Sequence, residues 1–231
     1  MIYAGVVAVK STKNAMERQP NQAQIILTFL RQAEKLKTEL RHSWLSDPTR
    51  QESVAEHTWM SLLFAMAVAT SMEQEIDQLK VLKMLIIHDL PEAIIGDIPV
   101  FEISERKEQK YETEKRAIRE ITHSLPHQLA EEICALWQEF EAKETNEALL
   151  AQAIDKMEAN IQHNLADLDT WDEGDYRVQV GYKDPYFQFD RFIKDLKVAV
   201  NQQTYKKVSE LGKLSNFSPE QLSLLEQDVN V

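Results

Sequence analysis

The sequence predicts an all-α protein, and three observations lead to this fold class. Glycine and proline, which interrupt helices, occupy only 5 and 7 of the 231 positions. Hydrophobic residues make up 43% of the chain, enough for one substantial core at this length. Apolar residues recur at intervals of three and four, the periodicity of amphipathic helices. We expect one helical bundle over residues 21–205, an N-terminal extension over 1–20, and a C-terminal extension with a short helix over 206–231.

The apolar periodicity sets the predicted helices in order along the chain. Ser53 followed by Glu56 is a capping-box pattern, which fixes the start of one helix. Pro48 interrupts the chain before it, because the residue preceding a proline disfavours helix, whereas Pro91 and Pro126 suit first helical turns. The predicted helices have the approximate bounds 21–40, 53–71, 79–87, a short one from Pro91, 104–123, 126–140, 146–171, 186–200, and a short last one from Ser218.

Three segments are predicted to be irregular or peripheral. Gly96-Asp97-Ile98-Pro99 is typical of a turn. The acidic stretch 167–175 is predicted to be an exposed helix end and loop. The apolar start, Ile2 to Val9, lacks the basic leader and cleavage site of a signal peptide, so we expect a short strand or an extension there.

The composition argues against several classes of binding partner and metal site. The formal net charge of −12 argues against nucleic acid and anionic membranes as partners, because both require a basic surface. No apolar run approaches the length of a membrane span. The single cysteine, Cys134, excludes an intrachain disulfide and a thiolate zinc cluster. It fits a reducing cytoplasm.

Four polar residues fall at inward positions of the predicted helices. His57 lies on the apolar side of its helix, His88-Asp89 ends another apolar run, and Asp155 lies within a third. A buried carboxylate needs a partner, because burying it alone costs several kcal/mol. Two imidazoles and two carboxylates without sulfur suit a borderline divalent ion such as Mn, Fe, Co, Ni or Zn. A core histidine beside a helix-capping aspartate would explain an isolated His-Asp pair, but not all four residues together.

Two further acidic residues follow the His-Asp pair. Glu92 is placed to transfer a proton to or from a leaving group, although a carboxylate at a helix N-terminus is also favoured by the helix dipole. Asp97 is placed to accept a hydrogen bond from a substrate hydroxyl, or to serve only as a turn residue. His42 could line the pocket mouth, although nothing in its spacing requires this. His163 lies two turns past Asp155 and somewhat off its face, and is a candidate ligand for a second metal.

These residues carry a family resemblance. The sequence resembles the HD-domain metal-dependent phosphohydrolases, and most closely their 5′-deoxynucleotidase branch, over about residues 21–171. The matching segments are Arg41-His42-Ser43-Trp44, Glu56-His57, His88-Asp89 with Pro91-Glu92 and Gly96-Asp97, Leu136-Trp137-Gln138-Glu139-Phe140-Glu141, and Ala153-Ile154-Asp155-Lys156. The resemblance implies an HD-domain helical bundle, a cytoplasmic homodimer and hydrolysis of (deoxy)ribonucleoside 5′-monophosphates to nucleoside and phosphate.

The resemblance also implies roles for individual residues. One divalent ion would be held by the ligands His57, His88, Asp89 and Asp155. Glu92 would transfer the proton and Asp97 would hold the sugar. Arg41 and Trp44 would orient phosphate and deoxyribose, with Glu141 as a further contact. In the bacterial deoxynucleotidases the arginine and tryptophan are adjacent, whereas His42 and Ser43 separate them here.

Two other classes of function remain open from the sequence. One is an HD phosphodiesterase acting on another phosphate ester, or a di-iron oxygenase; both typically require extra histidine ligands that this chain does not clearly supply. The other is a non-catalytic nucleotide-binding module that has kept the fold. Metal stoichiometry separates one ion from two, and phosphate release from nucleotides separates an enzyme from a binder.

Overall fold

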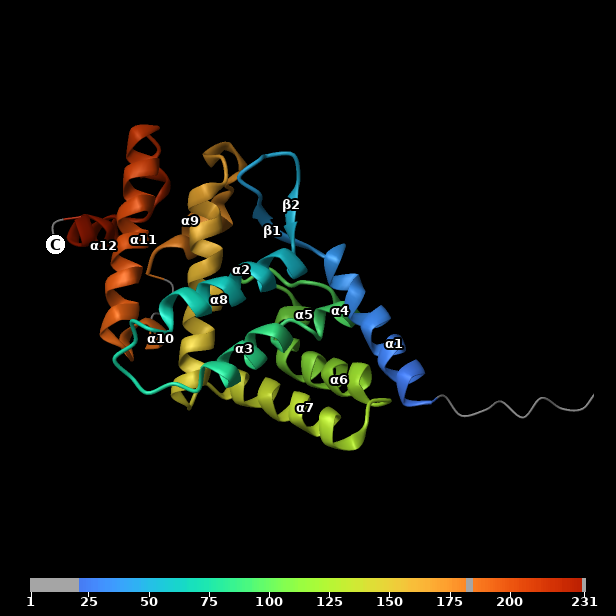
Figure 1. Cartoon of the computed structure of the whole chain (residues 1–231). Coiled ribbons are helices and arrows are strands. Elements are labelled where there is room, and N and C mark those ends of the chain that lie inside the picture. The colour runs from blue at the N-terminus through green and yellow to red at the C-terminus, as the bar shows by residue number, and fades with distance from the viewer. Residues whose placement is uncertain (1–20, 182–184, 230–231) are drawn as a thin grey trace, which may run out of the picture.

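A computed structural model describes residues 21–181 and 185–229 and confirms the helical fold class (Figure 1). The strand or extension expected over residues 2–9 lies outside the described residues. None of the described helices is both long and apolar enough to cross a bilayer. The α-helices are α1 Gln22–Ala33, α2 Val54–Val68, α3 Gln78–Ile87, α4 Glu92–Ile95, α5 Glu105–Glu108, α6 Lys110–Thr122, α7 His127–Ala142, α8 Asn146–Leu165, α9 Glu173–Gln179, α10 Pro185–Gln188, α11 Arg191–Glu210 and α12 Pro219–Val229.

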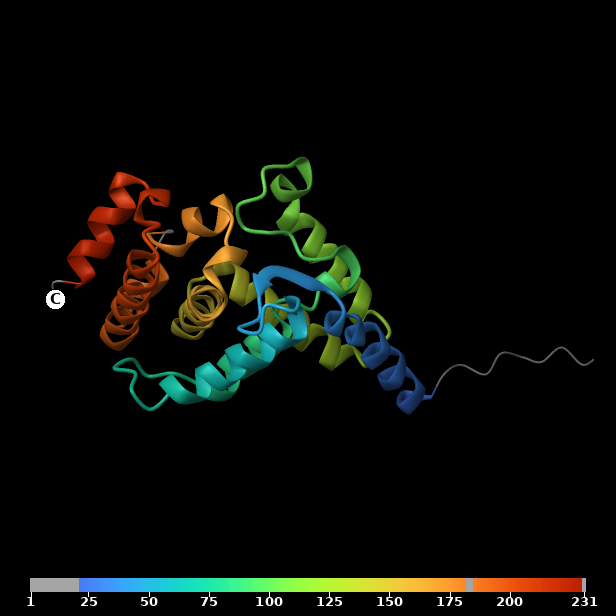
Figure 2. The same ribbon diagram turned by 90° about the horizontal axis from the view of Figure 1, so that it is seen from above.

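Helix α8 is the centre of the bundle. It packs against α2, α3 and α7 on one side and against α10 and α11 on the other, as the two perpendicular views show (Figures 1 and 2). Its residues Leu150, Ile154 and Met157 are almost fully buried in the main hydrophobic core. A polar side chain on this helix therefore points into the interior of the protein unless it lies at an edge.

The predicted first helix is wrong beyond Ala33. After α1 a short 3-10 helix (Glu34–Lys37) follows, and then the strand β1 (Leu40–Trp44) pairs antiparallel with β2 (Gln51–Ser53). The proline-containing segment between them forms the hairpin loop rather than a simple helix break. The capping box predicted at Ser53 is confirmed, because its backbone N–H donates to Glu56 at 2.9 Å and its hydroxyl accepts from the Glu56 N–H. The second strand of the hairpin is thus followed directly by α2.

The structure also corrects the end of α8 and the acidic stretch behind it. The helix stops at Leu165, because Ala166 is extended, and the chain turns so that Trp171 can donate from its indole N–H to the carbonyl of His163. The acidic stretch is not a wholly exposed loop. Asp172 caps α9, and Asp175 is only 2% exposed. This corner carries α9 back over the bundle.

Two other helix boundaries differ from the predictions. The charged helix expected over 104–123 is broken at Gln109 into α5 and α6. The helix expected over 186–200 is instead the short α10 followed by α11, which runs through the predicted domain boundary at residue 205. Helix α12 packs against α11, and the segment after that boundary shares a small hydrophobic cluster with buried residues between positions 168 and 180.

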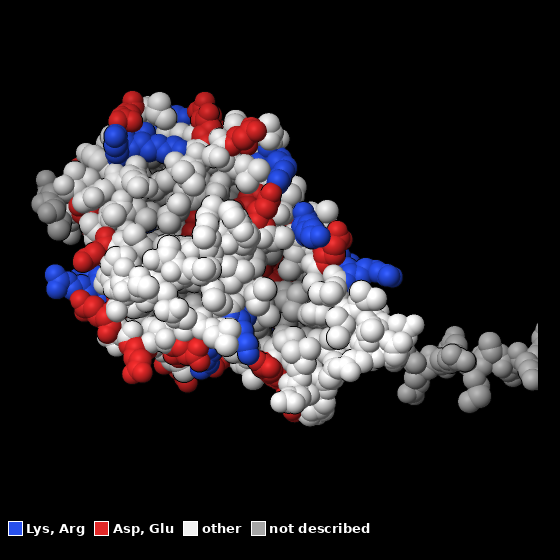
Figure 3. Space-filling model, viewed as in Figure 1, with Lys and Arg blue, Asp and Glu red and all other residues white. Residues whose placement is uncertain are grey.

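One face of the bundle is apolar and exposed. On α2, the side chains of Trp59, Leu63 and Met66 are 61%, 48% and 65% exposed, and they share one side of the helix because they are spaced four and three residues apart. Ile86 of the neighbouring α3 is exposed as well. Figure 3 shows charged side chains around the edge of this face and few in its middle.

Candidate active site

The four predicted metal ligands meet although they come from three separate segments. His57 lies near the start of α2, His88 and Asp89 directly follow α3, and Asp155 lies in the middle of α8. His57 Nε2 is 3.2 Å from Asp155 Oδ1 and 3.9 Å from Asp89 Oδ2. His88 Nε2 is 3.1 Å from Asp89 Oδ2 and 3.8 Å from Asp155 Oδ1. Both imidazole rings are fully buried.

The hydrogen bonds on the outer side of each ring fix which nitrogen faces the cluster. His57 Nδ1 lies 2.5 Å from Oε2 of Glu158, and His88 Nδ1 lies 2.7 Å from the carbonyl oxygen of Leu85. Both partners are acceptors, so Nδ1 carries the hydrogen and a neutral ring turns its Nε2 lone pair toward the carboxylates. His88 Nε2 is buried and has no hydrogen-bond partner among the described residues. The cluster therefore presents several electron-rich atoms to one another.

The carboxylates of the cluster are held in their charged form. Burial alone would raise the pKa of Asp155, but the Lys156 ammonium, 2.6 Å from its Oδ2, and both imidazoles hold that pKa well below its usual range. For Asp89, burial is likewise outweighed, by His88, His57 and Arg41, which hold its pKa below its usual range. Two charged carboxylates in one buried cluster repel each other, and the adjacent Lys156 and Arg41 offset part of this repulsion.

The donor set fits a divalent metal ion. His57, His88 and Asp155 each offer a ligand atom within 4.8 Å of the others, and Asp89 Oδ2 lies beside both imidazoles. Imidazole nitrogens and carboxylate oxygens are the ligands that borderline divalent metals accept. Glu158 and the Leu85 carbonyl supply the outer hydrogen bonds that orient metal-binding histidines. The cluster is therefore a candidate site for a divalent metal ion.

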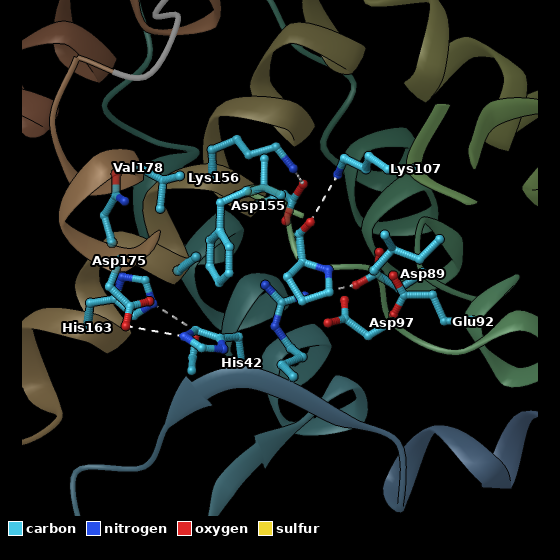
Figure 4. Close-up of a pocket in the computed structure, with 18 of the residues that line it drawn as sticks. His42, Asp89, Glu92, Asp97, Lys107, Asp155, Lys156, His163, Asp175 and Val178 are labelled. Carbon is cyan, nitrogen blue, oxygen red and sulfur yellow. Dashed lines mark hydrogen bonds and ion pairs between the residues drawn. The ribbon is translucent and has the colours of Figure 1, made fainter. Parts of the chain in front are cut away.

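A cavity opens against this cluster (Figure 4). Asp89 and Asp155 of the cluster line it, and in the view His163 and Asp175 lie on the left, Asp89 on the right and Asp155 between them. Apolar residues also line the wall among the charged and polar ones, namely Ile98, Pro99, Val100, Phe101, Ala159, Val178 and Phe187. A cavity lined by both charged and apolar side chains suits an amphipathic small molecule.

Glu92 and Asp97 both line this cavity. Glu92 is the first residue of α4, is 3% exposed, and has one carboxyl oxygen without a hydrogen-bond partner among the described residues. Burial, with the charges of Asp89 and Asp97, raises the pKa of Glu92 well above its usual value. Burial also raises the pKa of Asp97, although Arg41 opposes the shift. Glu92 is thus a buried carboxyl group whose raised pKa favours its protonated form, in the cavity beside the predicted metal ligands.

The three other predicted substrate contacts are placed differently from one another. Arg41 of β1 lines the cavity, and its Nη1 lies 3.4 Å from Asp89 Oδ2. Trp44 ends the same strand but is not among the residues that line this cavity or its neighbour; its carbonyl accepts a hydrogen bond from Gln162. Glu141 of α7 lines a second cavity that reaches the other side of Asp89. The structure brings Arg41 to the metal cluster and leaves Trp44 apart from it.

Several residues of this region were not predicted from the sequence. Glu158 holds His57, and its position three residues after Asp155 on α8 would have placed it on the same helix face. Lys110 of α6 and Lys156 of α8 line both cavities beside the metal cluster. Their place is set by packing between distant helices, for which the sequence carries no local signal.

The opposite end of the cavity forms a second cluster of imidazoles and carboxylates. His42 Nε2 lies 3.3 Å from both Asp172 Oδ2 and Asp175 Oδ2, and His163 Nε2 lies 3.2 Å from Asp175 Oδ1. The edge of the His42 ring also meets the Phe101 ring, with centroids 4.7 Å apart and planes at 82°. This cluster escaped prediction because the acidic stretch was expected to be solvent-exposed.

The fold and the site together define a class. A helical bundle in which a histidine, a later His-Asp pair and a still later aspartate converge on one candidate metal site is typical of HD-domain proteins. A family profile described as HD domain matches residues 33–197. The chain belongs to the HD domain family.

The chain is also similar to proteins with a named activity. The chain is 39% identical over 143 residues to the 5′-deoxynucleotidase HDDC2 of Dictyostelium discoideum, and this alignment covers 59% of this chain and 74% of that protein. It is 32% identical over 142 residues to the 5′-deoxynucleotidase HDDC2 of Homo sapiens, with 61% and 67% covered. The crystal structure of a predicted metal-dependent phosphohydrolase from Magnetospirillum magnetotacticum superposes with a TM-score of 0.71 at 27% identity, covering 86% of this chain and 96% of that one.

Proposed function

We propose that the protein is a metal-dependent 5′-nucleotidase that hydrolyses (deoxy)ribonucleoside 5′-monophosphates to nucleoside and phosphate. The observation that carries this proposal is the buried Glu92, with one carboxyl oxygen unpaired among the described residues, in a cavity that Asp89 and Asp155 of the predicted ligand set also line. The similarity to 5′-deoxynucleotidases supports the same activity. A bare binding module would have no need of an acid at this position.

The residues of the chain divide the reaction among them. His57, His88, Asp89 and Asp155 would hold a divalent metal ion, which would supply Lewis acidity for the activation of water and phosphate. Hydrolysis forms a bond from water oxygen to phosphorus and breaks the bond from phosphorus to O5′. Glu92 donates its proton to the departing O5′, and the attacking water gives up the proton that restores the acid.

Two residues of the cavity wall orient the substrate in this scheme. Arg41 is fixed beside Asp89, so its guanidinium can offset the charge on the phosphoryl oxygens as the bond to O5′ breaks. Asp97 lines the same cavity and accepts a hydrogen bond from a sugar hydroxyl. Trp44 and Glu141 have no assigned part in this scheme, because neither lines the cavity that holds Glu92.

The finer properties follow from the same observations. We infer one ion per chain, drawn from Mn, Co, Fe, Ni and Zn, because the ligand set contains nitrogen and oxygen but no sulfur. We infer a homodimer formed through the exposed apolar face of α2, since Trp59, Leu63 and Met66 gain from burial against a second copy. The single free thiol, Cys134, supports a cytoplasmic location.

A nucleotide panel tests the proposed function. Phosphate release is measured from deoxy- and ribonucleoside 5′-monophosphates after removal of metal with a chelator and addition of Mn, Co or Zn. The proposal expects metal-dependent release from at least one series and none with the chelator alone. Release that persists in full with excess chelator, or no release with any metal, contradicts it.

A further inference from the structure

His42 offers a hydrogen-bond donor to the cavity. It lies on β1, its ring lines the cavity wall, and its side chain is 27% exposed. Nε2 faces two carboxylates at 3.3 Å, so this nitrogen carries a hydrogen. The other ring nitrogen, Nδ1, has no hydrogen-bond partner within residues 21–181 and 185–229.

The surroundings of His42 favour its charged form. The hydrogen bond with Asp175 raises the pKa of His42 above its usual value, and the charge of Asp172 adds to this effect, although burial opposes it. In the imidazolium both nitrogens carry hydrogen. The ring therefore has one N–H committed to carboxylates and, in its charged form, a second N–H at Nδ1 that has no partner among the described residues.

The ring is also held in one orientation. Asp172 Oδ1 accepts from the backbone N–H groups of Gly174 and Asp175, and Asp175 Oδ2 accepts from the N–H of Asp172, so backbone amides fix both carboxylates. Phe101 packs edge-on to the His42 ring. A Cβ at Gly174 would lie 2.7 Å from the Phe101 ring, so only glycine lets Phe101 sit this close. The donor is held ready before any ligand arrives.

A purely structural ion pair would account for only part of this arrangement. A histidine that only joins β1 to α9 has no use for cavity exposure or for an unpaired N–H. His163 shows the structural alternative in the same cluster, since it is buried, its Nδ1 pairs with Gln179 Oε1 and its Nε2 lies 3.2 Å from the Ser43 hydroxyl. His42 differs from it in both respects.

We propose that His42 binds the nucleobase of the substrate, donating from Nδ1 to a carbonyl oxygen or ring nitrogen of the base. Asp172 and Asp175 are positioning residues that hold the ring and its charge. The proposal rests on the proposed function, because a phosphate at the metal cluster directs the remainder of a nucleotide along the cavity toward His42 (Figure 4). The ligand class is a nucleoside 5′-monophosphate whose base presents an acceptor.

The test compares substrates with and without a base. His42→Gln is assayed on deoxyguanosine 5′-monophosphate and on 2-deoxyribose 5-phosphate, with His127→Gln at an exposed position as the matched control. A lost hydrogen bond to a charged donor is worth roughly ten- to a hundredfold. We expect kcat/KM of His42→Gln to fall by that factor on the nucleotide, mainly through KM, and to change less than about twofold on the base-free sugar phosphate. A fall shared by both substrates, or by neither, overturns the proposal.

Asp175→Asn separates positioning from direct contact. It keeps the shape of the side chain but removes the charge that fixes the imidazolium, so KM for the nucleotide rises while kcat on the sugar phosphate is kept. An unchanged KM for the nucleotide contradicts the positioning role.

A binding measurement keeps the inference apart from the proposed reaction. If the wild-type protein releases no phosphate from any substrate, the proposed function fails, but binding of deoxyguanosine alone is still measurable by saturation-transfer NMR. Weaker binding to His42→Gln than to wild type and His127→Gln supports the inference, and equal or absent binding overturns it.

Discussion

The two ends of the cavity contain the same kinds of side chain but differ in what completes them. The metal cluster has His57, His88, Asp89 and Asp155, and the far cluster has His42, His163, Asp172 and Asp175. The separations between nitrogen and oxygen are similar, 3.1–3.9 Å in the first and 3.2–3.3 Å in the second. Composition and spacing alone therefore do not distinguish a metal site from a hydrogen-bonded network.

The difference lies in the groups outside each cluster. In the far cluster, both carboxylates accept from backbone amides of α9 and so have donors of their own. In the metal cluster, neither Asp89 nor Asp155 accepts from a backbone amide among the described residues, and both imidazoles use Nδ1 on outside acceptors. The donors to Asp155 and Asp89 are instead two charged side chains, Lys156 and Arg41. The clusters thus differ in whether backbone amides or cationic side chains stabilise their carboxylates.

Replacing one carboxylate in each cluster should give the largest difference between the two clusters, measured as metal content and phosphate release. We expect Asp155→Asn to lose its bound metal and to reduce phosphate release by at least about 10³-fold, because the ion supplies several kcal/mol of charge stabilisation. Asp172→Asn should keep the metal. Metal per chain is measured by mass spectrometry on both variants. Equal metal content would remove the distinction drawn between the clusters.

Replacing Glu92 should have the next largest effect on turnover. Glu92→Gln keeps the volume but has no acidic proton, so turnover should slow by roughly 10²- to 10⁴-fold while metal content stays at the wild-type level. Steady-state kinetics and metal analysis together measure this. Full activity in this variant would assign proton transfer to another group.

Glu158 tests the role of the outer hydrogen bonds. Glu158→Gln should weaken metal affinity by about 10- to 100-fold, because the carboxylate orients His57 through Nδ1. Glu147→Gln on the same helix lies away from the site and serves as the control. Competition with a metal-sensitive dye gives both affinities. Matching values for the two variants would mean that the outer shell does not tune the site.

Glu114 of α6 shows what burial does to a carboxylate outside both clusters. Burial raises its pKa to about 7, so the folded protein binds a proton that the unfolded chain releases at lower pH. Stability contributed by this group is present below about pH 4.5 and is lost as pH rises through 7. Glu114→Gln should thus be more stable than wild type by about 1–3 kcal/mol at pH 8 and nearly equal to it at pH 4.5, allowing for the lost contact with Lys110. Urea unfolding at both pH values measures this, and a pH-independent difference would contradict the shifted pKa.

The sequence predicted the metal cluster better than the rest of the site for a physical reason. His57 and Asp155 lie on apolar helix faces, and that local pattern suffices to point them inward. Helical spacing would also have placed Glu158, three residues from Asp155. The hairpin was missed because β1 and β2 have only five and three residues, too few for a strand alternation to emerge.

The far cluster depends on contacts that no local pattern records. His42 and Asp175 are separated by 133 positions, and their pairing follows from the turn after α8 that carries α9 over the bundle. An acidic stretch beside glycine is most often solvated, so its burial becomes visible only once the chain is folded. The same applies to Arg41 and Trp44, whose strand was not expected.

Arg41 and His42 are consecutive residues of β1, one beside the metal cluster and the other at the far cluster. The spacing of these two consecutive residues therefore sets the distance between the side chains that would contact the two parts of a molecule spanning the cavity. A one-residue slip in the register of the hairpin would turn the side chains of Arg41 and His42 to the opposite face of the strand and misplace both of them. If Arg41 and His42 contact the two ends of one ligand as proposed, a substrate of a different length would require a change in this strand and not only in one side chain.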